Sequence, residues 1–181
     1  MANKANVVNS CTPIVHVLPD TGTIPNSANC PLLIYRGALA LPEDDPAATV
    51  EPLLQSNHWG DTWRDGIYPF HHYHSTAHEV LICYRGAARV QLGGEPGVTE
   101  AIRVGDVILI PAGTGHKRLH ASDDFAIVGG YPHGQDWDMC YGNPDERPRA
   151  DHNIARVSLP QADPIYGEDG PLLKHWTPAA L

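Results

Sequence analysis

The chain contains few cysteines and no apolar run long enough to cross a membrane. A membrane-spanning helix needs roughly 20 consecutive apolar residues, and every apolar run here is much shorter. Cys11, Cys30, Cys83 and Cys140 are far apart and form no CxxC pair, which argues against a zinc ribbon or a thioredoxin-type site. The N-terminal segment also lacks the apolar core of a secretory signal, so we expect a cytoplasmic protein with free thiols.

Positive charge is scarce as well. The chain has 12 Lys and Arg against 21 Asp and Glu, for a net charge of −9. Because nucleic acids and anionic membranes are bound through basic surfaces, we expect no nucleic-acid partner and no membrane partner. The patterns GxGxxG, GxxxxGK[ST] and GxSxG do not occur, so dinucleotide binding, P-loop phosphate binding and a hydrolase nucleophile elbow have no support.

Glycine and proline, by contrast, are abundant, with 17 of each spread along the 181 residues. This length fits one domain with terminal arms. From Gly66 onward, short β-rich runs are separated by Gly or Pro at intervals of roughly eight to twelve residues, which is typical of an all-β sandwich or barrel. The predicted strands are EVLICYRG (79–86), AARVQLGG (87–94), TEAIRVG (99–105), DVILIPAG (106–113) and DFAIVGGY (124–131).

Both flanks of this β-rich region have a different character. We assign residues 1–59 to an N-terminal arm that packs on the barrel and residues 60–160 to the barrel itself. Residues 161–181 form a segment that wraps around it. The arm holds two strand-like runs, PIVHVL (13–18) and PLLIYRGAL (31–39), and a helix within 45–59. Because Pro52 is awkward inside a helix, we expect this helix either to be short or to form two pieces.

The chain after Tyr131 is polar and rich in proline. Its segments HGQDWD (133–138) and NPDERPRADH (143–152) carry many charges, and we expect both to be solvated loops. The run IARVSLP (154–160) is predicted to be a last strand.

The most informative stretch is FHHYHSTAHEV, residues 70–80, which contains four histidines followed by a glutamate. Side chains alternate along a strand, so His72 and His74 share one face, and His71 and Tyr73 point the other way. A turn after His74 would return Glu79 to the same interior.

A fourth group lies further along the chain. GDVILIPAGTGH (105–116) reads as a buried strand, a sharp turn and then His116. A neighbouring strand could bring His116 to His72, His74 and Glu79. Four such groups inside a barrel make little sense without a cation, because a buried carboxylate without a partner is costly. Imidazole and carboxylate ligands suit one divalent transition metal: Fe, Mn, Ni, Co, Cu or Zn.

The two stretches resemble the two motifs of the cupin superfamily. The first, G-x5-H-x-H-x4-E-x6-G, runs from Gly66 to Gly86, and the second, G-x5-P-x-G-x2-H, from Gly105 to His116. The spacing is similar to that of germins. The flanking stretches IPN, PLLIYRGAL, YPHGQDWD and NIARVSLP resemble the small bacterial single-domain cupins called YjlB-like. The second motif usually ends in Asn, where this chain has His120.

This resemblance implies a jelly-roll barrel (a double-stranded β-helix) of two antiparallel sheets, with the metal held inside by His72, His74, Glu79 and His116. It leaves several functions open, because cupins include oxygenases, isomerases, decarboxylases and metal-free storage proteins. We expect a metal-dependent enzyme (an oxidoreductase or isomerase above all) that acts on a small polar molecule. The alternative is a non-catalytic module that binds a metal and a small ligand.

The candidates for catalytic groups beyond the metal ligands are His120, Tyr131 and Asp136. His78 is an alternative metal ligand if a turn brings it inward. Cys83 alternates with Glu79 and is expected in the core as a small hydrophobic side chain. Because the strand-bearing arm has no obvious place in a minimal barrel, we predict that it packs on the barrel edge or crosses to a second chain, forming a homodimer.

Overall fold

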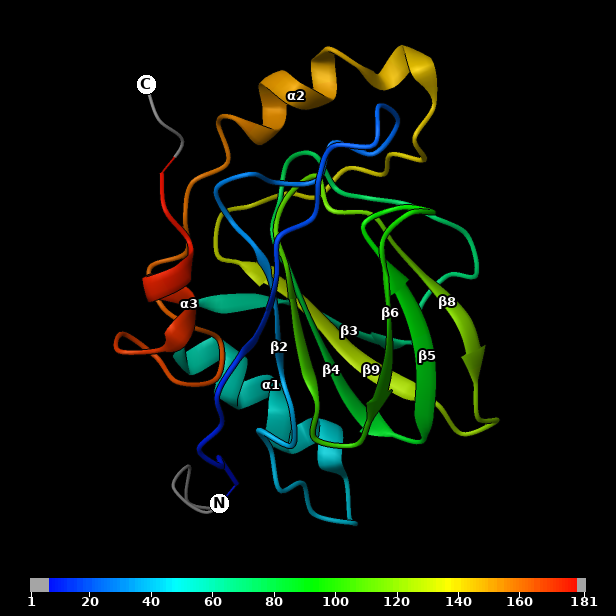
Figure 1. Cartoon of the computed structure of the whole chain (residues 1–181). Helices are drawn as coiled ribbons and strands as arrows, with labels where there is room; N and C mark the ends of the chain where they lie inside the picture. The colour runs from blue at the N-terminus through cyan, green and yellow to red at the C-terminus, as the bar shows by residue number, and fades with distance from the viewer. Residues whose placement is uncertain (1–6, 179–181) are drawn as a thin grey trace.

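The computed structural model describes residues 7–178, and its nine strands form two antiparallel sheets (Figure 1). The larger sheet has the order β1–β2–β7–β4–β9–β3, and the smaller has the order β6–β5–β8. The strands of the larger sheet are Ile14–His16 (β1), Leu32–Tyr35 (β2), Val107–Ile110 (β7), Glu79–Arg85 (β4), Ala126–Pro132 (β9) and Trp59–Asp65 (β3). Those of the smaller sheet are Val98–Arg103 (β6), Ala87–Leu92 (β5) and His116–Ala121 (β8). The expected all-β jelly roll is therefore confirmed.

Apolar side chains from the inner faces of the two sheets fill the space between them. On β4, Leu81 and Cys83 point into this interior, where they meet Ile108 of β7 and Val90 of β5. Cys83 is 1% exposed, as expected for a core thiol. The same alternation places Glu79 on the interior face, at the start of β4.

A second apolar layer covers the outer face of the larger sheet. Helix α1 (Pro46–Ser56) is one helix that continues through Pro52, so the two-piece alternative is wrong. Asp45 caps it, accepting from the Ala48 N–H, and the helix buries Val50 and Leu54 against the sheet. Val80 and Ile82 of β4 face this layer, so β4 is buried on both sides almost along its whole length. Such two-sided burial explains why β4 reads as a continuous apolar run rather than an alternating one.

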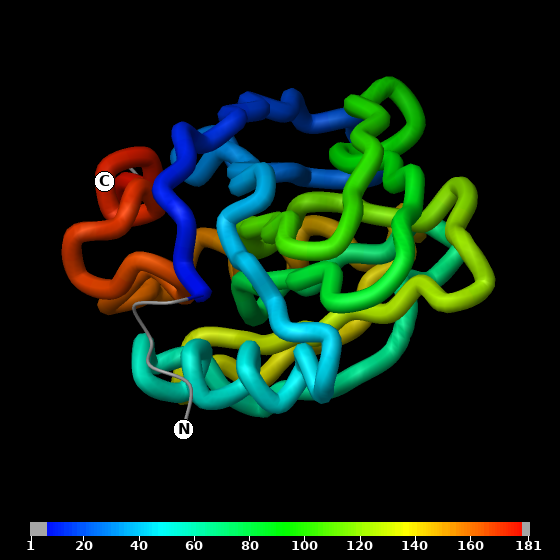
Figure 2. The backbone as a smooth tube through the Cα atoms, turned by 90° about the horizontal axis from the view of Figure 1, so that it is seen from below, coloured from blue at the N-terminus to red at the C-terminus, as the bar shows by residue number. Residues whose placement is uncertain are grey.

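The C-terminal segment completes the outer layer and runs beside the N-terminal arm (Figure 2). It contains helix α3 (Pro171–His175), and Trp176 is buried in the same cluster as α1. The Tyr166 hydroxyl donates to the Asn9 carbonyl, and the Thr177 N–H donates to the Asn29 carbonyl.

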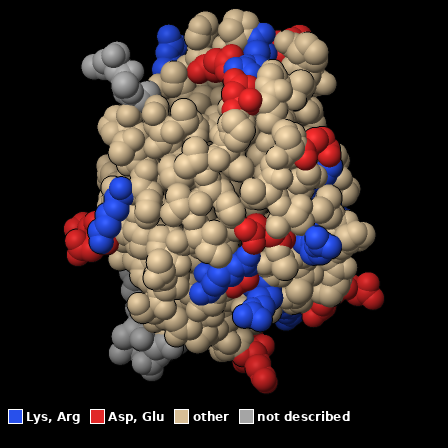
Figure 3. All heavy atoms as spheres, in the orientation of Figure 1, with Lys and Arg blue, Asp and Glu red and all other residues tan. Residues whose placement is uncertain are grey.

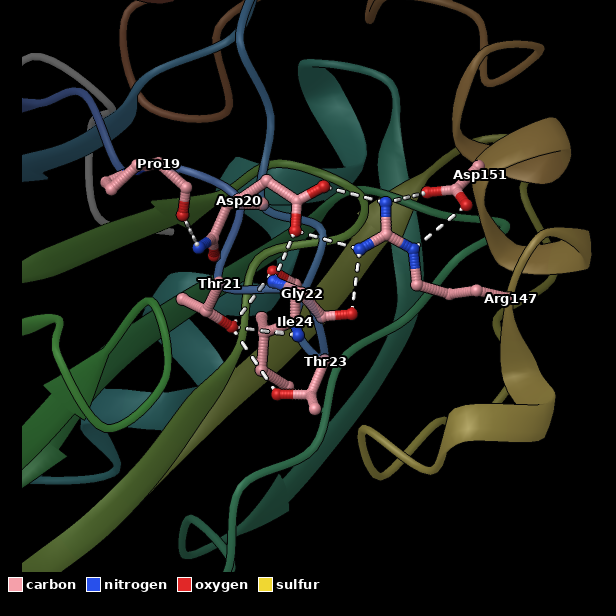
Figure 4. Close-up of polar contacts among 9 residues, drawn as sticks. Pro19, Asp20, Thr21, Gly22, Thr23, Ile24, Arg147 and Asp151 are labelled. Atoms are coloured by element: carbon pink, nitrogen blue, oxygen red, sulfur yellow. Dashed lines mark hydrogen bonds and ion pairs between the residues drawn. The ribbon is translucent and has the colours of Figure 1, made fainter.

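Arg147, in the segment after β9, binds the N-terminal arm (Figure 4). Arg147 donates to both carboxylate oxygens of Asp20, at 2.8 and 2.7 Å, and also to Asp151 and the Gly22 carbonyl. Asp151 lies in helix α2 (Arg149–Ile154), which crosses one end of the barrel in Figure 1. The contact between Asp20 and Arg147 joins residues 127 positions apart in sequence.

Several elements differ from the sequence expectations. Residues 154–160 form no strand: Ile154 ends α2, and the remainder has no regular structure. A local alternation of apolar residues does not specify a strand unless a sheet edge is available to pair with it. Segment 143–152 is likewise not simply a solvated loop. It holds the 3-10 turn η2 (Pro144–Glu146) as well as most of α2, and Glu146 is buried.

Within the described range, no helix is long and apolar enough to cross a membrane.

Candidate metal centre

Three histidines meet at one end of the barrel interior. His116 is the first residue of β8, and His72 forms a two-way backbone bridge with it, with N···O distances of 3.2 and 2.9 Å. His74 follows two residues later on the same extended segment, so its side chain returns to the side of His72. One ligand atom from each of the three lies within 4.8 Å of the others, which makes the group able to hold a metal ion.

Each of these imidazoles is oriented by its Nδ1 atom, which donates to a backbone carbonyl. The accepting carbonyls are those of Phe70 (3.2 Å, for His72), Asp138 (2.5 Å, for His74) and Thr114 (3.1 Å, for His116). A carbonyl only accepts, so Nδ1 carries the proton and the lone pair of the neutral ring is on Nε2. Histidines that ligate metals are held by this kind of outer hydrogen bond.

Glu79 lies against two of the three rings. Its Oε2 atom is 3.2 Å from His116 Nε2 and 3.4 Å from His74 Nε2. Oε2 is nevertheless buried and makes no well-aligned hydrogen bond among the described residues. A buried carboxylate oxygen in this condition is costly, and a cation among these atoms would satisfy it.

The ionisation of the cluster is consistent with such a cation. Burial disfavours the charged form of Glu79, but its interactions with His74 and His116 outweigh this effect and lower the pKa of the carboxyl well below its usual range. Burial opposes protonation of His74 too, yet Glu79 raises its pKa. Burial and then His116 lower the pKa of His72 to about 3. Glu79 thus favours a positive charge in the cluster, and a metal ion can replace the proton that supplies it.

A pocket of about 250 Å³ opens directly onto this cluster. Besides the histidines and Glu79, side chains of Trp63, Tyr131 and Trp137 line it. Tyr131 is the one catalytic candidate from the sequence that the pocket includes. It is 3% exposed, and its hydroxyl oxygen accepts a 3.0 Å hydrogen bond from Trp63 Nε1.

The other two catalytic candidates lie elsewhere. His120 is exposed on the outer face of the smaller sheet, paired with Arg89 of β5, and it borders a separate depression of about 590 Å³. Arg36 in that depression is paired with Glu100 and Asp106. Blue and red side chains accordingly lie next to each other on the face in Figure 3. Asp136 is exposed and does not line the metal pocket.

The remaining histidines of the 70–80 stretch are not in the cluster. His78 is buried, but its Nδ1 accepts from the Ala112 N–H at 3.0 Å and its ring packs on Trp176, 4.6 Å between centroids. Tyr73 was expected on the outer side of the sheet or against a partner chain; instead it is fully buried within this chain, and its backbone pairs with Cys140. The returning chain after β9 covers the side that local alternation assigned to solvent.

Segment 133–138 was expected to be a solvated loop, and this expectation was incomplete. Trp137 lines the metal pocket, and the Asp138 carbonyl holds His74. The Asp138 carboxylate also accepts from the Ser75 backbone N–H and hydroxyl, both at 2.5 Å. The one sequence signal for this role was a tryptophan in a polar loop immediately after the last barrel strand.

Comparison with known proteins agrees with this architecture. A family model described as a cupin domain matches residues 65–128, a span that includes both histidine motifs. A Bacillus subtilis (strain 168) protein named Uncharacterized protein YjlB is 42% identical over 161 residues, which are 89% of this chain and 94% of the relative.

Similar solved structures include pumpkin seed globulin, at 26% identity over 49% of this chain, with a TM-score of 0.36. The match spans only 25% of the length of that globulin. A DUF861 family protein from Thermotoga maritima matches at 19% identity over 54% of this chain and 96% of its own, with a TM-score of 0.33. Because the likeness to YjlB extends over most of both chains and the cupin model covers the whole histidine cluster, this chain belongs to the cupin superfamily, among its small bacterial YjlB-like members.

Proposed function

We propose that this cupin is a metal-dependent enzyme that acts on a small molecule bound in the pocket beside His72, His74 and His116. The environment of Glu79 supports this proposal most. Its buried Oε2 atom makes no well-aligned hydrogen bond among the described residues, and it faces imidazoles whose Nε2 atoms bind no backbone group. We assign Glu79 as the fourth ligand.

Three imidazoles and one carboxylate suit Fe, Mn, Ni, Co, Cu or Zn, whereas Mg and Ca prefer all-oxygen sites. When bound, such an ion supplies Lewis-acid chemistry, and iron, manganese or copper adds redox chemistry. Oxidation, isomerisation and decarboxylation of a small molecule are the reaction classes that this site can serve.

Tyr131 is the residue that we assign to proton or hydrogen-bond donation. Burial, followed by the charge of Glu79, raises the pKa of its phenol above the usual range, so it stays protonated at neutral pH. Its oxygen accepts from Trp63, and its own proton faces Glu79, so the phenol lies directly beside the proposed metal ligands. This geometry suits a donor to a substrate oxygen.

A second function has a specific observation in its favour. Apart from Tyr131 and the proposed ligands, the ionisable side chains that line the pocket within residues 7–178 are Arg64, Asp65 and Tyr68. Arg64 is engaged with Glu51, at 2.7 and 2.8 Å. A pocket with so few free acid–base groups also fits a non-catalytic module that binds a metal and a small ligand.

The first test is elemental analysis of the purified protein, with His116→Ala and His120→Ala run beside it. His120 is the matched control, because it lies on the same strand but faces solvent. We expect near-stoichiometric transition metal in the wild type and in His120→Ala, and its loss in His116→Ala. If the wild type holds no metal even after reconstitution, the proposal is wrong.

The enzyme and the binding module are then separated by product formation. The metal-loaded protein is incubated with a pool of small organic acids, and the pool is compared by mass spectrometry before and after. A mass change that requires the metal and disappears in His116→Ala supports the enzyme. Retention of a pool member without conversion supports the binding module.

A further inference from the structure

Four aromatic side chains line the pocket together with the histidines: Trp63, Tyr68, Tyr131 and Trp137. Tyr131 and Trp137 stack nearly parallel, at 6.0 Å between centroids and 21° between planes. Trp137 meets the edge of His74 at 5.5 Å, and Tyr68 meets His72 at 5.3 Å on the other side. These rings border the part of the pocket that leads to the histidine cluster, and this space is called the slot below.

Aromatic surface also extends from the pocket to solvent. Tyr68 and Trp137, which line the pocket, are 50% and 49% exposed. Phe70 stacks on Tyr68 at 5.0 Å and lies 6.0 Å from Tyr141, and these two rings are 44% and 51% exposed. Large rings left in water at one opening are a feature of ligand-binding surfaces rather than of ordinary protein exterior.

The charges around the pocket argue against a phosphorylated or multiply charged ligand. Among the residues that the structure describes, Arg64 is the only lysine or arginine that lines it. Its guanidinium is held by Glu51 and lies 3.6 Å from Asp45. A divalent cation beside the single carboxylate of Glu79 leaves one net positive charge at the cluster, which matches one anionic oxygen group.

The size of the pocket sets the scale of the ligand. A cavity of about 150 Å³ accepts benzene in a protein interior, and this pocket has about 250 Å³. It therefore has room for one ring and a small polar head. Tyr131 offers that head a hydrogen-bond donor fixed by Trp63.

We infer that the pocket binds a small aromatic monoanion, a single planar ring that carries adjacent oxygen donors. The oxygens face His72, His74 and His116, and the ring lies in the slot beside Trp137. This inference rests on the proposed metal function and narrows its substrate class from a small polar molecule to an aromatic one.

The test compares two probes with the same chelating head. Benzohydroxamate and acetohydroxamate both present two oxygen donors, and only the first has a ring. Binding of each to the Zn²⁺- or Co²⁺-loaded protein is measured by calorimetry. Because the slot buries most of one ring, we expect benzohydroxamate to bind about tenfold to a hundredfold more tightly.

Trp137→Ala is the diagnostic variant. Half of Trp137 is exposed, so the variant is expected to fold and to keep its metal, which elemental analysis checks. We expect it to lose about tenfold in affinity for benzohydroxamate and to leave acetohydroxamate nearly unchanged. Val104→Ala, at an apolar residue that is 45% exposed away from the pocket, is the control and should change neither affinity.

The possible failures are distinguishable. Equal affinities of the two probes for the metal-loaded wild type would overturn the aromatic class and leave the metal function standing. If Trp137→Ala still binds benzohydroxamate more tightly than acetohydroxamate to the same degree, the placement of the ring beside Trp137 is wrong. Undiminished benzohydroxamate binding to the metal-free protein would overturn the orientation of the oxygens toward the histidines. A protein that holds neither Zn²⁺ nor Co²⁺ would overturn both the inference and the proposed function.

Discussion

His72, His74 and His116 are positioned less by their own strands than by the carbonyl groups to which their Nδ1 atoms donate. Two of these carbonyls, from Phe70 and Thr114, lie two residues before the histidine that they hold. The third comes from Asp138, 64 residues from His74. One ligand therefore depends on a distant loop, and the other two depend on local chain geometry.

Glu79→Gln tests the contribution of the carboxylate charge. The substitution keeps shape and size but removes the negative charge that raises the pKa of His74. We expect metal affinity to fall by about 2–3 kcal/mol, a loss typical of a charge-assisted interaction. We also expect the pKa of His74 in the metal-free protein to decrease, because its attraction to Glu79 is lost.

Competition with a chromogenic chelator measures the affinity, and NMR titration of the histidines measures the pKa. Glu95→Gln, at a carboxylate outside the pocket, is the control. Unchanged metal affinity in Glu79→Gln would remove Glu79 from the ligand set.

The turn between β7 and β8 shows how whole elements share in building the site. The Asn26 side chain donates to the carbonyls of Pro19 and Gly93, at 2.7 and 3.1 Å, and its oxygen accepts from the Gly115 N–H at 3.4 Å. Its backbone N–H donates to Gly113. The N-terminal arm thereby holds the turn that immediately precedes His116.

Asn26→Ala is expected to lower the free energy of unfolding by about 2–4 kcal/mol, because it removes buried hydrogen bonds and places alanine at a positive φ. The φ of Asn26 is 54°. Metal affinity should decrease as well, since Gly115 loses its support. Asn9→Ala, which removes a single exposed hydrogen bond to Gly37, is the control and should cost less than about 1 kcal/mol in chemical denaturation. Equal effects of the two substitutions would contradict this role of the arm.

The clamp between Asp20 and Arg147 makes a prediction about pH. The hydrogen bonds from Arg147 hold the pKa of Asp20 below its usual value. The stabilisation is therefore fully present above the unfolded pKa of about 3.9 and disappears as the pH falls through the lower folded value. Asp20 is half exposed, so we expect Asp20→Asn to cost only about 0.5–1 kcal/mol at pH 7.

In acid, the wild type and Asp20→Asn should approach equal stability, because Asp20 is then protonated. Urea unfolding at a series of pH values measures the difference. Asp123→Asn makes the same charge change at an exposed turn outside the clamp and should show no such trend. A difference for Asp20→Asn that is independent of pH would exclude the ion pair as its cause.

At the scale of the whole molecule, the larger sheet separates two apolar layers. One fills the space between the sheets, and the other lies beneath α1 and the C-terminal segment. At the free edge of that sheet lies β1, with Ile14 and Val15 36% and 40% exposed and Val17 beside it 73% exposed. Within residues 7–178 no strand pairs with the outer side of β1. An apolar edge strand of this kind is a place where a second chain can pair.

The homodimer remains a prediction, and this edge is where we expect it to form. Light scattering should give twice the 19.6 kDa of one chain. The double substitution Val15→Lys and Val17→Lys should give single chains, because it puts like charges across the interface. Val104→Lys, at another exposed position, should leave the mass unchanged. A wild type that runs only as single chains would reject the dimer.

Most barrel strands could be predicted because apolar alternation and glycine spacing are local properties. Strand β3 and strand β8 were less visible, since their exposed faces carry polar and charged residues such as Arg64 and Arg118. The prediction of a strand at 154–160 was wrong, because Ala150 and Ile154 pack against the protein as part of helix α2. Ala150 packs with Ile24 and Tyr73.

The sequence by itself determined the fold family and the grouping of the three histidines, because the stretches from Gly66 to Gly86 and from Gly105 to His116 match the two cupin motifs. Only the tertiary structure decided the character of the pocket. Trp63 and Tyr131 lie on the paired strands β3 and β9, and Trp137 lies in the loop after β9. No sequence periodicity relates the three positions. Whether Tyr73 faces solvent or the core was decided in the same way, by chain that returns from far along the sequence to cover it.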